Sequence, residues 1–414
     1  MRDTARLGWL DALRGWAALT VVCFHLSPVV LGSERHLRIF QHIDFGKYGV
    51  LLFFLVSGYV IPMSLERHGS LRRFWVGRLF RIYPAYLATI ALVGALALAG
   101  LGTLPPGLRA DPLTGVLAHA TMMPDLLGLR GMVRVFWTLG YEMIFYLVVA
   151  GLFAVRLHRH SGWWASGLAL LALAGSRLPD GLFAAHRTVA AAVLLVGVAA
   201  AVTAGLAGRY RLAGLLGVGF VLLPAVNAHP TAESTVVASW QGVLLLAVLF
   251  AGTVIYRAQH GELGRWPAAL ALLVVVDCLA GAHAAYLSGP VWLATVAAVG
   301  LTFAGAFAAR RWALPRALTF LGTISYSLYL LHIVVLGQVT RLVPHLADRP
   351  APVRLAVAAV YLVFALGVAA LSQRWVERPG QALGRRILHA WARPIATQRA
   401  ATRTGRGENV RGGV

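Results

Sequence analysis

The sequence is poor in charged residues, in lysine and in cysteine. Only 13% of its 414 residues are charged, whereas soluble globular proteins carry about 25%. Acidic residues number 15 against 37 basic ones, and Lys47 is the only lysine. The two cysteines, Cys23 and Cys278, both lie inside apolar runs. The chain therefore has neither a disulfide framework nor a metal site built on paired cysteines.

The sequence also lacks the short motifs of several enzyme classes. It contains no G-x-x-x-x-G-K-[ST], no H-E-x-x-H, no G-x-S-x-G and no dinucleotide fingerprint. We expect no metal and no permanently bound cofactor. A net charge of +22 would suggest a nucleic-acid partner in a soluble protein. Here the arginines separate apolar runs, so orientation in a membrane explains them better, and we expect no nucleic acid as partner.

Long apolar runs are abundant. Hydrophobic residues make up 59% of the chain, and its mean hydropathy is +0.73. Several runs have about twenty residues, the length that crosses the hydrocarbon of a bilayer. We predict an all-α fold, a polytopic transmembrane helix bundle of about ten to twelve spans. The runs lie at 10–31, 47–65, 84–102, 134–155, 163–176, 186–207, 211–227, 236–256, 266–287, 290–309, 318–340 and 354–375.

Basic residues are distributed unevenly between the two sides of these runs. If the chain begins in the cytoplasm, 26 of the 37 basic residues fall on the cytoplasmic side. The positive-inside rule therefore predicts that both termini are cytoplasmic. Residues 393–414 are basic and almost free of apolar side chains, so we expect a disordered cytoplasmic tail after the membrane-embedded domain of residues 7–380.

The first apolar run carries three ionisable residues, Asp11, Arg14 and His25. Such residues are costly inside a membrane and are therefore candidates for function. Arg14 and His25 are eleven positions apart, so on a helix they share a face and are separated by about 16 Å of rise. We expect Arg14 at the membrane boundary and His25 at mid-membrane depth. A secretory signal peptide is excluded by the charges and by the missing cleavage site.

A second cluster combines arginine with aromatic residues. Arg72, Arg73, Arg78 and Arg81 fall within ten residues, and Arg78 and Arg81 are neighbours on one helical face. Arginine suits phosphate oxygens, and the interleaved aromatic side chains could stack on an adenine ring. The alternative is that the cluster only sets membrane orientation.

A carboxylate, Glu142, lies inside the fourth run between aromatic residues. A buried carboxylate needs a partner, and His25 or an arginine are the candidates. Glu142 could fix helix register as part of an ion pair or orient His25 as a general base, and we favour the second role. Ser57, Trp137 and Tyr141 are candidates for lining a substrate groove, although helix packing alone would explain Ser57.

Two further segments lie near the C-terminus. Ser325, Tyr329 and His332 follow the spacing of one helical face, and interhelical hydrogen bonding explains them as well as catalysis does. The sequence Glu377-Arg378-Pro379 follows the last apolar run, and we interpret it as structural because proline cannot continue a helix.

Taken together and in order, these segments resemble the bacterial acyltransferase 3 family of integral membrane O-acyltransferases. The resemblance covers residues 7–380, although residues 160–310 match only as hydrophobic spans. The motifs that carry it are Leu-Asp-Ala-Leu-Arg-Gly-x-Ala with the histidine at position 25, Phe-Phe-Leu-Val-Ser-Gly-Tyr, Arg-x-x-Arg-Ile-Tyr-Pro at 78–84, Trp-Thr-Leu-x-x-Glu-x-x-Phe-Tyr at 137–146, Ile-Ser-Tyr-Ser-Leu-Tyr-Leu-Leu-His and Glu-Arg-Pro.

The resemblance implies transfer of an acyl group, often acetyl, from cytoplasmic acyl-CoA to a hydroxyl of a sugar-containing acceptor. It implies a multi-pass protein of the bacterial inner (plasma) membrane, in the form without an additional hydrolase-like domain. His25 would be the catalytic base or acyl relay, and Arg14, Arg78 and Arg81 would contact the CoA portion. Glu142 matches an acidic position of the family.

Two other classes stay open at this stage. A transporter or flippase for a lipid-linked saccharide would also need many spans and intramembrane charge. It would not need an arginine cluster aligned with a histidine, so we rank it second. A non-catalytic membrane scaffold is the third. Within the enzyme class, the acceptor could be a surface polysaccharide or a glycosylated secondary metabolite.

Overall fold

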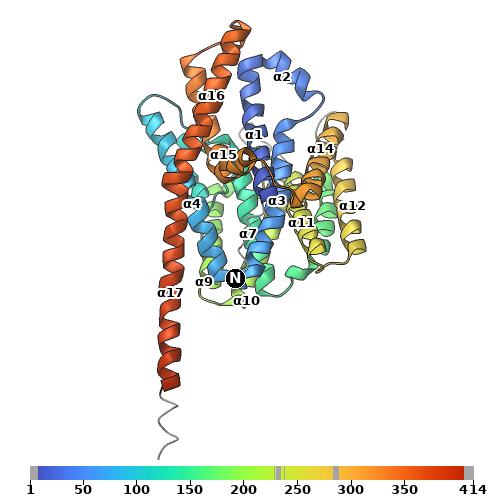
Figure 1. Cartoon of the computed structure of the whole chain (residues 1–414), viewed down its shortest axis with the longest axis vertical. Coiled ribbons are helices and arrows are strands. Elements are labelled where there is room, and N and C mark those ends of the chain that lie inside the picture. Colours follow the sequence, from blue (N-terminus) through green and yellow to red (C-terminus); the bar gives the residue numbers. More distant parts are fainter. Residues whose placement is uncertain (1–7, 228, 230–234, 237, 283–288, 405–414) are drawn as a thin grey trace, which may run out of the picture.

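The structure is a computed structural model, and it describes residues 8–227, 229, 235–236, 238–282 and 289–404. Each of the twelve apolar runs contains a helix in its described part, and the described residues contain no strand, which confirms the all-α bundle (Figure 1). Nine of the helices in these ranges are long and apolar enough to cross a membrane. The runs at 163–176, 211–227 and 266–287 form shorter helices.

The long helices and their bounds are α1 (Gly8–Leu31), α3 (Phe45–His68), α4 (Leu71–Leu98), α7 (Trp137–Ala154), α9 (Arg187–Leu206), α11 (Ser239–Gln259), α14 (Gly289–Ala308), α15 (Arg316–Leu342) and α16 (Ala351–Ser372). The shorter apolar helices are α8 (Ser161–Ala172), α10 (Tyr210–Gly219) and α12 (Arg265–Gly281). The connections add α2 (Ser33–Phe40), α5 (Pro106–Ala110), α6 (Pro112–Ala120) and 3₁₀ turns such as η1 (Asp125–Leu127) and η2 (Arg134–Phe136).

α7 and α11 form the centre of the bundle. Every residue from 137 to 152 is buried, as is nearly all of α11. Lipid is as apolar as these side chains, so close packing at small residues holds such helices together. A Cβ atom at Gly58 of α3 would lie 1.8 Å from the Leu249 carbonyl oxygen of α11, and one at Gly252 would lie 2.1 Å from the Leu55 carbonyl oxygen. Only glycine fits at this crossing.

A second close crossing joins α1 to α15. A Cβ atom at Gly15 would lie 2.6 Å from the backbone nitrogen of Gly322, and one at Gly322 would lie 2.1 Å from the Asp11 carbonyl oxygen. Ten residues further along each helix, His25 of α1 meets His332 of α15. The equal spacing shows that the two helices run parallel, with the glycine contact fixing their register.

The bundle has two distinct ends. The far end of the last helix lies at one end, towards which the start of α1 points; we call it the termini end (Figure 1). α2 and the turn that joins it to α1 lie at the other, which we call the loop end. At the loop end, buried Asp125 accepts hydrogen bonds from the backbone N–H groups of Thr235 (2.8 Å) and Val236 (3.3 Å), and burial raises its pKa to about 6. Which end faces the cytoplasm stays a prediction from the charge distribution.

The last helix does not stop at Pro379 as the sequence suggested. A π-helical turn, Gln373–Glu377, follows α16 and leads directly into α17 (Arg378–Thr404). The wider π turn admits a proline, which lacks the N–H that an α-helix needs. Buried Glu377 accepts hydrogen bonds from the backbone N–H and the hydroxyl of Ser327 on α15. The helix thus continues into the segment expected as a tail, and residues 405–414 lie outside the described residues.

Candidate active site

His25 is half-buried on α1, six residues before the helix ends. Six residues correspond to about 9 Å of rise, so His25 lies near the end of α1 at the loop end. Arg14 lies three turns earlier on the same helix and is buried. The depths of the two residues in a membrane stay predictions.

Hydrogen bonds define the protonation of the two facing histidines. Nδ1 of His25 lies 2.9 Å from the Val21 carbonyl oxygen, and Nδ1 of His332 lies 2.8 Å from the Tyr329 carbonyl oxygen. A carbonyl oxygen only accepts, so each Nδ1 carries the hydrogen. Nε2 of the neutral His332 is then an acceptor, and it lies 3.3 Å from Nδ1 of His25. The Nε2 atom of His25 keeps its lone pair, as a general base requires.

A polar cavity of about 290 Å³ adjoins His25 at the loop end. Its lining includes Asp44, Lys47, Arg134 and Trp137, which come from the start of α3, from η2 and from the start of α7. Lys47 lies over the Trp137 ring, 5.2 Å from its centroid. Burial raises the pKa of the Asp44 carboxyl group, which caps α3 by accepting from the Lys47 backbone N–H at 2.8 Å. Charged groups and an indole together suit an acceptor rich in hydroxyl groups.

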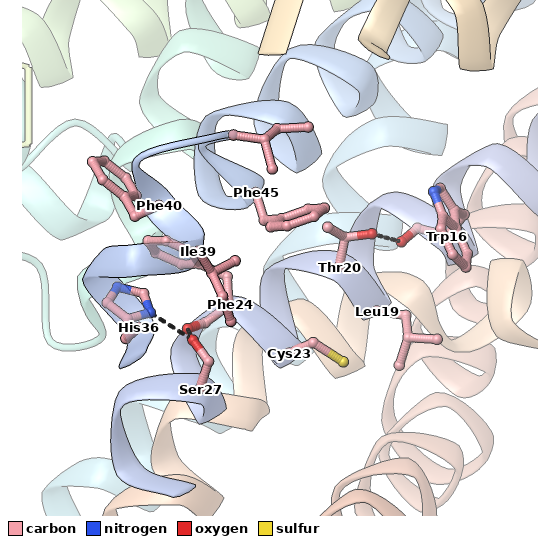
Figure 2. A pocket seen from close by; sticks show the side chains of 11 residues that line it. Trp16, Leu19, Thr20, Cys23, Phe24, Ser27, His36, Ile39, Phe40 and Phe45 are labelled. Carbon is pink, nitrogen blue, oxygen red and sulfur yellow. Dashed lines mark hydrogen bonds between the residues drawn. The ribbon is translucent and has the colours of Figure 1, made fainter. Parts of the chain in front are cut away.

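An apolar cavity of about 300 Å³ lies between α1 and α2 (Figure 2). Phe24 lines both this cavity and the one beside His25. His36 of α2 is hydrogen-bonded to Ser27 of α1 at 2.7 Å, which holds α2 against α1. Cys23 lines this cavity and not the one beside His25.

Glu142 has partners other than the histidine that we expected. Its carboxylate accepts hydrogen bonds from Tyr146 at 2.6 Å and from Ser57 at 3.5 Å. The hydrogen bonds of His25 among the described residues go to Val21 and His332. The expected contact between Glu142 and His25 is absent from the described residues, where His332 contacts His25 instead.

The predicted arginines gather around Glu142. Buried Arg14 lies over the Phe53 ring, 5.5 Å from its centroid, and interacts electrostatically with Arg81 and Glu142. Buried Arg78 lies 5.4 Å from the centroid of Tyr146, which donates to Glu142. The structure thus brings these residues into one cluster on the termini side of His25.

A column of aromatic contacts links this arginine cluster to the histidines. Phe53, beneath Arg14, stacks on Tyr329 with ring centroids 6.3 Å apart and planes at 10°. Tyr329 lines the His25 cavity, and its ring centroid is 6.0 Å from that of His332. Its hydroxyl lies 2.9 Å from that of Thr138. These contacts connect Arg14 to His25 through Phe53, Tyr329 and His332.

The three candidates for a substrate groove have separate positions. Trp137 lines the His25 cavity, whereas Ser57 contacts Glu142 deeper in the bundle. Tyr141 contacts Trp137 edge to face and packs against Gly242 of α11. Trp137 is therefore the one that the structure places beside His25.

Sequence analysis did not single out Lys47 or Arg134 as site residues, and it gave His332 no partner. The one available signal for Lys47 was its rarity, because it is the only lysine of the chain. Arg134 resembled any other loop arginine. Within the described ranges, no group of three or more His, Cys, Asp or Glu side chains is placed to hold a metal ion.

Comparison with known proteins places the chain in a family. Residues 7–373 match a family model described as an acyltransferase domain. Acyltransferase MdmB of Streptomyces mycarofaciens is 30% identical over 171 residues, which are 40% of this chain and 44% of that protein. Peptidoglycan O-acetyltransferase OatA of Listeria monocytogenes is 28% identical over 153 residues, 34% of this chain and 23% of that protein.

A third relative, Nodulation protein 10 of Rhizobium leguminosarum bv. viciae, is 28% identical over 184 residues. The match covers 40% of this chain and 48% of that protein. The chain thus spans less than half the length of each of these relatives. No solved structure matches it.

Proposed function

The chain belongs to this acyltransferase family, and from this premise we propose that it is a multi-pass membrane O-acyltransferase, together with its donor, its acceptor and its base. The donor is acyl-CoA, with acetyl-CoA as the simplest case, and it binds at the termini end. The acceptor is a hydroxyl group of a sugar-containing molecule, and it binds in the cavity at the loop end. The protein works in the bacterial plasma membrane, with the termini end facing the cytoplasm, where acyl-CoA is made.

The observation that carries this proposal is the free Nε2 of His25 beside a polar cavity. The acceptor hydroxyl gives its proton to this nitrogen while its oxygen attacks the thioester carbonyl carbon. The tetrahedral intermediate then collapses, the carbon–sulfur bond breaks, and the CoA thiolate leaves. The imidazolium returns the proton to the thiolate, so the histidine ends as it began. General-base catalysis of this kind accelerates a reaction by roughly 10²–10⁴-fold.

His332 supports this step from α15. Its Nε2 accepts from the Nδ1–H of His25, which fixes the ring so that the other nitrogen points away from α15. As the imidazolium forms, the same contact stabilises the new charge. His332 is therefore a positioning residue for His25.

The arginine cluster supplies the donor side of the proposal. Arg14 and Arg78 face Glu142, and Glu377 faces Arg14 and Arg81. The planar guanidinium groups of these arginines suit phosphate oxygens. The pantetheine arm of CoA is an extended chain, and the rise from Arg14 to His25 is about 16 Å. The pantetheine arm would follow the aromatic column of Phe53 and Tyr329 and bring the thioester towards His25.

Acyl transfer by purified full-length protein in lipid nanodiscs tests the proposal. With radiolabelled acetyl-CoA and a pool of sugar acceptors, the wild type should release labelled product, and His25→Ala should lower turnover at least a hundredfold at unchanged protein yield. His345→Ala, an exposed histidine at the loop end, is the matched control and should behave as wild type. Near-normal turnover by His25→Ala would overturn the assignment. A transporter would consume no acetyl-CoA at all.

A further inference from the structure

A cavity of about 430 Å³ opens at the termini end between α4, α17 and the end of α3. Its lining contains no carboxylate. Besides Arg78 and Arg81 of the proposed donor site, its basic residues are His68, Arg73, Arg385 and His389. The four arginines around this cavity repel one another unless an anion lies between them.

The glycines of α17 explain why that helix contributes to the cavity. A Cβ atom at Gly380 would lie 2.6 Å from Pro84, and one at Gly384 would lie 2.8 Å from Phe80. Residue numbers rise along α17 while they fall along α4 in these two contacts, so α17 packs antiparallel and very close to α4. Further along, Arg72 lies over the Trp391 ring, 5.3 Å from its centroid.

Arg385 and His389 are four residues apart on α17 and therefore share a face. Arg386, the next residue after Arg385, points about 100° away and does not line the cavity. The cavity brings Arg385 together with Arg73 and the buried Arg78. None of the three has a carboxylate within ion-pair distance in the described part of the chain.

The basic side chains of the cavity differ in solvent exposure from its inner end to its outer end. Arg78 is buried at the inner end beside Tyr146, whereas Arg73, Arg385 and His389 are exposed at the outer end. In CoA the diphosphate joins the pantetheine arm, and the 3′-phosphate on the ribose lies further from the thioester. A donor whose thioester points into the bundle would therefore place its 3′-phosphate at the outer end.

We propose that α17 forms one wall of the donor site, with Arg385 and His389 binding the 3′-phosphate of acyl-CoA. This inference rests on the proposed function, because it takes the donor to be acyl-CoA. It adds a helix from the C-terminal end of the chain to a site that the sequence assigned to α1 and α4. The phosphate of an anionic lipid headgroup has the same chemistry, so the experiments separate the two sources.

Steady-state kinetics of full-length protein in neutral phosphatidylcholine nanodiscs provide the first test, with acetyl-CoA and acetyl-3′-dephospho-CoA as donors. Arg385→Ala should raise the KM for acetyl-CoA on the order of tenfold, the size of one charge-assisted hydrogen bond, and leave kcat unchanged. It should leave the KM for the dephospho donor unchanged. Arg386→Ala is the matched control, with the same charge change on the same helix. An equal rise for both donors, or an equal effect of Arg386→Ala, would overturn the proposal.

Equilibrium binding of adenosine 3′,5′-bisphosphate provides a second test that needs no turnover. The wild type should bind it in neutral nanodiscs, and Arg385→Ala with His389→Ala should weaken binding at an unchanged elution volume in gel filtration. If the wild type binds the bisphosphate but transfers no acyl group, the proposed function fails and the α17 site stands. If only nanodiscs containing phosphatidylglycerol distinguish the variant from wild type, the site binds a lipid headgroup and the proposal is wrong.

Discussion

His25 and His332 have the same side chain, but their surroundings give them different chemistry. His332 is fully buried and uses Nδ1 on backbone carbonyls of its own helix, so Nε2 can only accept. His25 donates its Nδ1–H towards Val21 and His332, so Nε2 is left for a substrate. The base is therefore defined by its hydrogen bonds and not by a neighbouring carboxylate.

Substitutions at His332 test its positioning role. Its contact with His25 needs only an acceptor at the place of Nε2, and the side-chain oxygen of glutamine can reach that place. His332→Leu should lower kcat about tenfold or more, whereas His332→Gln should recover much of the loss, as measured with purified protein of matched thermal stability. If His332→Gln is as poor as His332→Leu, the hydrogen bond to His25 does not matter and the role is wrong.

The position of Glu142 among Tyr146, Ser57 and the arginines predicts a structural effect. Glu142→Gln keeps an acceptor for Tyr146 but removes the negative charge that faces buried Arg14 and Arg78. Leaving buried charge without compensation costs on the order of a few kcal/mol. We expect a lower thermal midpoint and a lower yield, with kcat per folded molecule within about threefold of wild type. A hundredfold fall in kcat at unchanged thermal midpoint would instead show that Glu142 acts in catalysis.

At the scale of elements, the parallel pair α1 and α15 positions His25 and His332, the histidines of the proposed site. Gly15 and Gly322 allow the two helices to approach closely, because a side chain at either position would collide with the backbone of the other helix. Ten residues beyond this contact the histidines lie within reach of each other. The crossing therefore positions the two histidines as well as joining the two helices.

A larger residue at Gly322 should therefore separate His25 from His332. Overpacking of this kind costs about 1–3 kcal/mol, and Gly322→Leu should lower both the thermal midpoint and kcat. Gly337→Leu on the same helix is the matched control, since a Cβ atom there meets nothing within 4 Å. Equal behaviour of the two variants in a thermal melt and an activity assay would contradict the account of this crossing.

At the scale of the whole molecule, the two functional cavities lie at opposite ends of the bundle. The basic cavity at the termini end and the His25 cavity at the loop end share no lining residue. The arginine cluster lines the first cavity through Arg78 and Arg81, and the aromatic column lines the second through Tyr329. Arg14 and Phe53 connect the two. This division suits a reaction whose donor and acceptor arrive from different sides of a membrane.

The sequence predicts the helices well because apolar length alone decides them in a membrane. The run that carries Arg14 and His25 is one example, and the shared face of its charges follows from helical period. The pairing of His25 with His332 could not be predicted, because it depends on a glycine contact between helices about 300 residues apart. For the same reason the sequence analysis paired Glu142 with the wrong residue. A carboxylate and a histidine are plausible partners by residue type, and only the fold shows whether they meet.

The C-terminal helix shows a second limit of sequence reasoning. Pro379 and the charged residues that follow it indicate a helix end, and a local pattern cannot reveal that a π turn carries the helix past the proline. The apposition of Arg385 and Arg73 depends in turn on Gly380 and Gly384 packing against α4. Such contacts arise from the fold and leave no local signal.

The most direct test of the account is the sidedness of acyl transfer in proteoliposomes of known orientation. Radiolabelled acetyl-CoA is supplied on one side only, and labelled acceptor is measured on the other. Transfer should occur when the donor meets the termini end and should be lost in His25→Ala. Transfer with the donor supplied only at the loop end, or transfer that persists in His25→Ala, would contradict the account.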